Sequence, residues 1–225
     1  MSSNPLVLID GDTIGRGRTG DETYTVNLLR ELPAAAPELT FAASLRNPAD
    51  LPSDVPAAVR ANLGTLPPGP AWAVAGLSEG GSCAIMLALR HPGLFATFGD
   101  FSGLAGPRVG ETNDDTADTV AQLFGGSQQA FAAHEPADLL ATGRFPHTGG
   151  WFEVGDLDDE PLAAAQQLVP LATAAGIATC LVVVPDGDHT FDLWSAAFRQ
   201  SLPWTAQRLG LVAVSPTATA PCQPL

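Results

Sequence analysis

The sequence predicts a three-layer α/β/α domain with a mostly parallel sheet, and two observations carry this prediction. Short apolar runs of strand type alternate along the chain with segments whose apolar residues recur at helical spacing. This alternation is typical of parallel sheets with helices on both faces, because each crossover between parallel strands needs a long connection. The 225 residues are 45% hydrophobic and 15% charged, which indicates a globular core and excludes a disordered chain.

The front of the chain is expected to hold two strands and two helices. Leu6–Ile9 is an unbroken apolar run and is predicted to form a buried strand. Glu22–Leu32 carries apolar side chains close to helical spacing, and the proline that follows should end this helix. The same criteria predict a second strand at Leu39–Leu45 and a short helix at Val55–Leu63.

Strands and helices continue to alternate through the rest of the chain. The strand-type runs are Ala71–Ala75, Leu94–Phe98, Trp151–Val154 and Thr179–Val184. The helix-type segments are residues 82–91, 116–124, 127–134, 161–175 and 191–209. We therefore expect residues 1–66 to form a Rossmann-like βαβ segment in the same sheet as a core at 67–212, followed by a disordered tail at 213–225.

The stretch Gly76-Leu-Ser78-Glu-Gly80 reads G-x-S-x-G and joins a predicted strand to a predicted helix. A serine on such a turn is the nucleophile elbow of the α/β-hydrolases. The turn strains the backbone of its central residue and crowds the residues two before and two after it. Glycine at both positions meets that requirement, so we expect Ser78 to be a nucleophile in an α/β-hydrolase-like domain.

A serine nucleophile needs a base and an acid, which follow it in that fold in the order serine, acid, histidine. Of the four histidines, His189 lies in the loop after a predicted strand and is the expected base; His91, His134 and His147 fit this position less well. The acid should follow the strand at Trp151–Val154. Asp158 has the expected placement. Asp159 and Asp156 are alternatives, because a small change in the loop conformation decides which of these carboxylates faces the histidine.

From Trp72 to Leu211 the chain resembles the putative esterase family, which includes esterase D-like enzymes and, more distantly, the antigen 85 mycolyltransferases. The resemblance rests on Gly76-Leu-Ser-Glu-Gly-Gly, Phe101-Ser-Gly, Trp151-Phe-Glu-Val-Gly and Gly187-Asp-His-Thr-Phe-Asp-Leu-Trp. It implies hydrolysis or transfer of an acyl group through an acyl-serine. It also implies that Ser78 is the nucleophile and His189 the base, with Asp158 as the acid.

The first ~65 residues do not share that resemblance. The run from Val7 to Tyr24, followed by Asn27–Leu32, resembles the N-terminal edge of a retaining GT-B glycosyltransferase, which makes the expected domain truncated or chimeric. The donor-binding half of such enzymes is absent, so glycosyl transfer is not expected. Gly15–Gly20 spells G-x-G-x-x-G, but its first glycine follows the strand too late and two arginines intervene, so no dinucleotide cofactor is predicted.

An acyl-serine mechanism also needs donors for an oxyanion. The backbone N–H of Glu79, directly after the nucleophile, is the expected first donor. We expect the first strand to lie beside the strand before Ser78, with the second strand outside it. The turn after the first strand would then open near Ser78, and Gly11 or Asp12 would supply the second donor.

The expected function is therefore a serine esterase acting on small-molecule esters or thioesters. The alternatives are an acyltransferase of the mycolyltransferase type, a fusion or truncation product with impaired catalysis and, less favoured, a nucleotide- or sugar-binding module. The net charge of −14 argues against nucleic acid, and no apolar run is long enough for a membrane span. The N-terminus lacks signal-peptide features, so a cytoplasmic location is expected. The cysteines form no C-x-x-C pair, so no metal site is predicted. The sequence does not indicate an oligomeric state.

Overall fold

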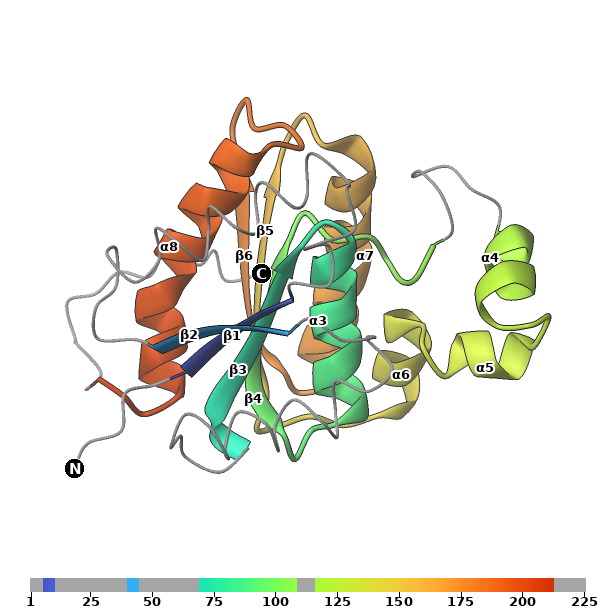
Figure 1. The fold of residues 1–225 in the computed structure, drawn as a ribbon, viewed down its shortest axis with the longest axis horizontal. Helices are drawn as coiled ribbons and strands as arrows, with labels where there is room; N and C mark the ends of the chain where they lie inside the picture. Colours follow the sequence, from blue (N-terminus) through green and yellow to red (C-terminus); the bar gives the residue numbers. More distant parts are fainter. Residues whose placement is uncertain (1–5, 11–39, 45–68, 109–115, 213–225) are drawn as a thin grey trace.

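The computed structural model describes residues 69–108 and 116–212 in full, and residues 6–10 and 40–44 as backbone strands. Its main sheet has four parallel strands in the order β3-β4-β5-β6 (Figure 1). These strands are β3 at Gly69–Leu77, β4 at Phe95–Phe101, β5 at Gly149–Gly155 and β6 at Ala178–Val184. The prediction of a parallel α/β sheet of the α/β-hydrolase type is confirmed in this part of the chain.

Six described helices accompany the sheet. They are α3 at Glu79–Arg90, α4 at Thr116–Leu123, α5 at Gln128–Ala132, α6 at Pro136–Thr142, α7 at Asp159–Ala174 and α8 at Phe191–Arg208. Five of them match predicted helical segments to within a few residues. α6 was not predicted; it is a short helix with proline at its first position and glycine after its end.

The helices lie on both faces of the sheet and form three layers (Figure 1). On one face α3, α6 and α7 enclose a core that includes the aromatic rings of Phe98 and Phe152. On the other face α8 covers a second core around Phe101 and Trp151. Neighbouring residues of β4 and β5 thus point to opposite covered faces, which is why these strands are buried almost throughout and mostly apolar.

The two strands near the N-terminus depart from the expected arrangement. β1 at Leu6–Asp10 and β2 at Thr40–Ser44 pair in parallel, but as a separate two-stranded sheet. β1 lies close to β3 without hydrogen-bonding to it. This corrects the expectation of a single sheet with the first strand bonded beside the strand before Ser78. An apolar run predicts that a strand is buried and paired, but not which sheet it joins.

Several predictions from the sequence fall outside the described residues. They concern the helices expected at 22–32 and 55–63, the turn holding Gly11 and Asp12, and the tail at 213–225. Among the described helices, none combines the length and the apolar character that a bilayer span requires.

Candidate active site

Ser78 lies on a strained turn between β3 and α3. β3 ends at Leu77 and α3 begins at Glu79, while Ser78 has φ 52° and ψ −128°. A non-glycine residue with positive φ costs roughly 1–3 kcal/mol, so the surroundings must hold it in place. The N–H of Ser78 donates to the carbonyl of Phe101 on β4 at 2.8 Å, which anchors the turn to the sheet. The predicted strand-serine-helix arrangement is confirmed.

The two glycines of the G-x-S-x-G pattern have different roles. A Cβ on Gly76 would collide with the backbone of Gly80, so this position requires glycine. A Cβ on Gly80 would meet no atom within 4 Å. The expectation that both positions must be small is therefore correct for Gly76 and wrong for Gly80, because the first turn of α3 carries position 80 outward.

His189 connects Ser78 with Asp158 through two hydrogen bonds. Its Nε2 lies 3.0 Å from Oγ of Ser78, and its Nδ1 lies 2.8 Å from Oδ2 of Asp158. Because an ionised carboxylate can only accept, Nδ1 carries the proton toward Asp158 and leaves Nε2 free to accept from the serine hydroxyl. The ring of His189 also packs edge-on against Trp194 of α8, with ring centroids 4.7 Å apart. Three residues that are far apart in the sequence thus form one hydrogen-bonded chain.

Of the three candidate acids, the structure brings only Asp158 to His189. Asp158 precedes the first residue of α7 and is buried, whereas Asp156 and Asp159 on either side of it are exposed. The loop that carries the acid is tied to the loop that carries the histidine. The N–H of Leu157 donates to the carbonyl of Gly187 at 2.9 Å, and this contact fixes the distance between the two loops.

Glu79 follows the nucleophile and is the first residue of α3, so its backbone N–H has no acceptor within the helix. Its side chain accepts from the N–H of Arg108 at 3.4 Å, and the guanidinium of Arg108 pairs with Glu135 at 2.9 Å. Burial raises the pKa of both glutamates, and Arg108 opposes the shift. The other two expected donors, Gly11 and Asp12, lie outside the described residues.

Two buried carboxyl groups on the central strands were not found from the sequence. Burial raises the pKa of Asp100 on β4 to about 7, with the N–H of Gly103 opposing the shift. Burial likewise raises the pKa of Glu153 on β5 to about 7, against a 2.8 Å hydrogen bond from the indole N–H of Trp151. The signal in the sequence is a charged residue inside an otherwise apolar strand.

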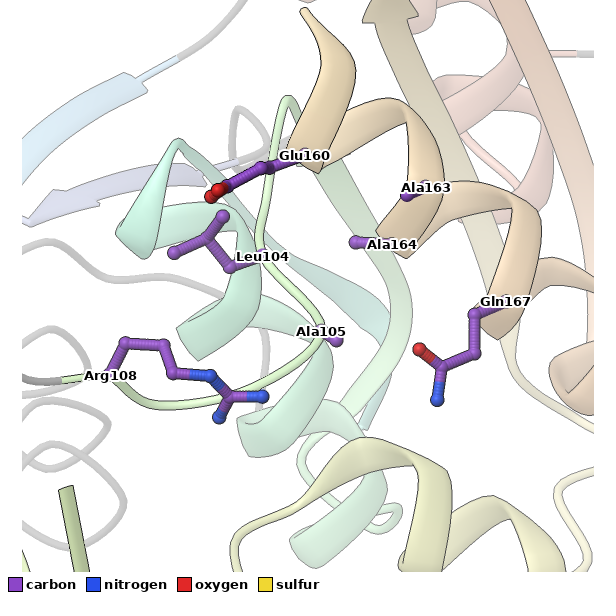
Figure 2. A pocket seen from close by; sticks show the side chains of 7 residues that line it. All are labelled: Leu104, Ala105, Arg108, Glu160, Ala163, Ala164 and Gln167. Carbon is purple, nitrogen blue, oxygen red and sulfur yellow. The ribbon is translucent and has the colours of Figure 1, made fainter. Parts of the chain in front are cut away.

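A cavity of about 220 Å³ opens between α7 and the loop after β4. It is lined by Leu104, Ala105, Arg108, Glu160, Ala163, Ala164 and Gln167. Figure 2 shows Arg108 and Gln167 on opposite sides of it and Glu160 in the first turn of α7. Glu160 comes two residues after Asp158, and Arg108 contacts Glu79, so the cavity neighbours the hydrogen-bonded chain. Within residues 69–108 and 116–212, no three metal-ligating side chains lie together.

A family model described as putative esterase matches residues 7–205. The match begins near the N-terminus, which corrects the expectation that the esterase resemblance starts at Trp72. We expected the first ~65 residues and the rest of the chain to have different origins, but one family model spans both parts. The resemblance to a glycosyltransferase gains no support from this match. A βαβ segment with a glycine-rich first loop occurs in many parallel α/β folds, so that pattern does not distinguish them.

An uncharacterized protein of Corynebacterium glutamicum is 37% identical over 146 residues, which are 62% of this chain and 33% of that protein. The chain therefore spans about a third of the length of this curated relative.

Solved structures share the fold across almost the whole chain. A ferulic acid esterase is 15% identical and covers 92% of this chain and 86% of its own, with a TM-score of 0.68. The fluorophosphonate-binding serine hydrolase FphF of Staphylococcus aureus is 17% identical, with 91% and 85% covered and a TM-score of 0.68. MPT51 of Mycobacterium tuberculosis is 20% identical, with 94% and 91% covered and a TM-score of 0.62.

Proposed function

This chain belongs to the putative esterase family, and we propose that it cleaves carboxylic ester or thioester bonds through an acyl-serine intermediate. The observation that carries the proposal is the chain of hydrogen bonds from Ser78 through His189 to Asp158. A serine hydroxyl is a poor nucleophile until a positioned base accepts its proton. His189 is held at the required distance, and Asp158 fixes the tautomer in which Nε2 can act as that base.

In the first half of the reaction Oγ of Ser78 attacks the acyl carbonyl and its proton moves to Nε2 of His189. The carbonyl oxygen becomes an oxyanion, for which the N–H of Glu79 at the N-terminus of α3 is the proposed donor. When the tetrahedral intermediate collapses, the bond to the alcohol or thiol breaks, and the proton on Nε2 passes to that leaving group. The acyl group stays on Ser78 as an ester.

In the second half water replaces the alcohol and the same groups act in reverse. His189 takes a proton from water as the oxygen attacks the acyl-serine, and it returns that proton to Oγ when the acid product leaves. For the second oxyanion donor we keep the prediction of Gly11 or Asp12, because β1, which precedes them, lies close to β3. The proposed substrates are small esters, and no metal or cofactor takes part in these steps.

The roles of serine and acid are tested by the rate of hydrolysis of a short p-nitrophenyl ester. Ser78→Ala should lower kcat by several orders of magnitude, and Asp158→Asn by about 10⁴-fold, because the imidazole then loses its orienting acceptor. Asp159→Asn and Asp156→Asn are the matched controls, since both residues are exposed neighbours that do not reach His189; they should stay within about threefold of wild type. Equal losses in Asp158→Asn and Asp159→Asn would overturn the assignment of the acid, and full activity in Ser78→Ala would overturn the proposed function.

A further inference from the structure

Asp100 is a buried carboxyl group that the proposed reaction does not use. It lies on β4, paired across the sheet with Gly76 of the G-x-S-x-G turn, and its side chain is 3% exposed. Within the described part of the chain its Oδ1 has no hydrogen-bond partner. The carboxyl group interacts with the backbone N–H of Gly103, but burying its Oδ1 without a partner still costs free energy. Such an arrangement in a folded protein calls for an explanation, and its place beside the nucleophile suggests one.

Asp100 fills the space between the start of α3 and the loop after β4. A Cβ on Gly81, in the first turn of α3, would collide with Oδ1 of Asp100, and so would a Cβ on Gly103 in the loop. The same two segments are joined by Ser82, whose Oγ accepts from the N–H of Leu104 at 2.9 Å and donates to its carbonyl at 3.1 Å. The carboxyl group is therefore packed between backbones on the two segments that hold the nucleophile turn.

We propose, building on the proposed function, that Asp100 is a positioning residue that holds the first turn of α3 in the geometry in which Ser78 attacks and the N–H of Glu79 stabilises the oxyanion. The carboxyl group acts through α3 and does not touch the substrate. Its uncharged form serves this role, because a negative charge under the first turn would oppose the positive potential that the helix N-terminus offers to the oxyanion.

The pKa of Asp100 lies in the pH range in which esterase activity would be measured. Burial raises its pKa to about 7, so the uncharged form is present at and below neutral pH and the charged form above it. Charged residues also lie on the segments that adjoin Asp100. α3 carries Glu79 and the loop after β4 carries Arg108, which bind each other, while β3 presents Gly76 at the paired position. On the far side of Ser78 lies His189, which is hydrogen-bonded to Asp158.

The test is the pH profile of kcat for the p-nitrophenyl ester in wild type, Asp100→Asn and Glu153→Gln. Wild-type kcat should decline above about pH 7 as Asp100 ionises, whereas Asp100→Asn stays uncharged and should hold its rate. The ratio of kcat in Asp100→Asn to that in wild type should rise about tenfold between about pH 6 and about pH 9, the order of magnitude expected from one nearby unit charge. Glu153→Gln is the matched control, because Glu153 is a second buried carboxyl group with a pKa of about 7, and it binds Trp151 instead of bordering α3. The ratio of kcat in Glu153→Gln to that in wild type should not change with pH.

A purely structural role would lower the activity of Asp100→Asn by the same factor at every pH, and that result overturns the proposal. A wild-type rate that rises to a plateau without declining overturns it as well, with no variant needed. If Asn does not fit the site, Asp100→Ser supplies a smaller uncharged side chain for the same ratio. Failure of the proposed function is recognised separately, because wild type would then hydrolyse no ester at any pH.

Discussion

At the scale of single residues, the site depends on a backbone conformation that the side chain of Ser78 does not favour. The positive φ of Ser78 lifts its hydroxyl to His189, and the cost of that conformation is met by contacts around it. Those contacts are the hydrogen bond from its N–H to Phe101 and the close approach of Gly76 to Gly80. The glycine at position 76 is therefore part of the machinery that holds the nucleophile.

This asymmetry between the two glycines predicts different effects of one added methyl group. Gly76→Ala should destabilise the protein by more than about 2 kcal/mol, because its Cβ collides with backbone that cannot move without undoing the turn. Gly80→Ala should leave the free energy of unfolding within about 1 kcal/mol of wild type, since its Cβ points into open space and alanine favours helices. Denaturant unfolding measures both values, and equal destabilisation by the two variants would contradict this account of the turn.

At the scale of elements, the carboxyl ends of parallel strands bring the catalytic loops together. β3 leads into Ser78, β5 leads into Asp158, and β6 leads into His189. Because these strands run in one direction in one sheet, their following loops meet at the same edge. β4 lies between β3 and β5 and contributes the buried Asp100, while β5 contributes the buried Glu153.

These two carboxyl groups predict how the stability of the sheet depends on pH. Both pKa values are raised on folding, to about 7, so between about pH 4 and pH 7 the folded state binds more protons than the unfolded state. The contribution to stability is fully present below the unfolded-state pKa values near 4 and is lost as the pH rises through about 7. Each group can account for roughly 3 to 4 kcal/mol of this loss at most.

The free energy of unfolding, measured by denaturant titration between about pH 5 and about pH 8, checks this prediction. Wild type should lose stability over this range, and Asp100→Asn and Glu153→Gln should each lose less, because the substituted side chains do not titrate. The prediction would be contradicted if the free energy of unfolding of wild type rose over this pH range. It would also be contradicted if the free energy of unfolding of both variants fell with pH as steeply as that of wild type.

The sequence predicted the parts of the site that local pattern controls. The G-x-S-x-G turn, the strand before His189 and the acidic loop before α7 each have a recognisable local signature, and the structure brings Ser78, His189 and Asp158 together. The structure was needed to choose Asp158 over its neighbours, because the conformation of the loop decides which carboxylate points toward His189. The environment of Asp100 could not be predicted, since contacts with Gly81 and Gly103 depend on packing between segments.

At the scale of the whole molecule, the front of the chain is the part that the sequence placed wrongly. The apolar run Leu6–Ile9 predicts a strand, but long-range packing decides that β1 pairs with β2 in a sheet of its own. The family match at 7–205 includes this segment together with most of the rest of the chain. We therefore predict that the full chain carries a reactive serine.

Covalent labelling of the full chain by a fluorophosphonate probe tests this claim most directly. The probe phosphonylates a serine only when a base activates it, so the folded protein should gain a single adduct, and peptide mass spectrometry should locate it at Ser78. Ser78→Ala and His189→Ala should gain none under the same conditions. Absence of an adduct on the folded wild-type chain, or an adduct that persists in Ser78→Ala, would contradict the assignment of Ser78 as the nucleophile.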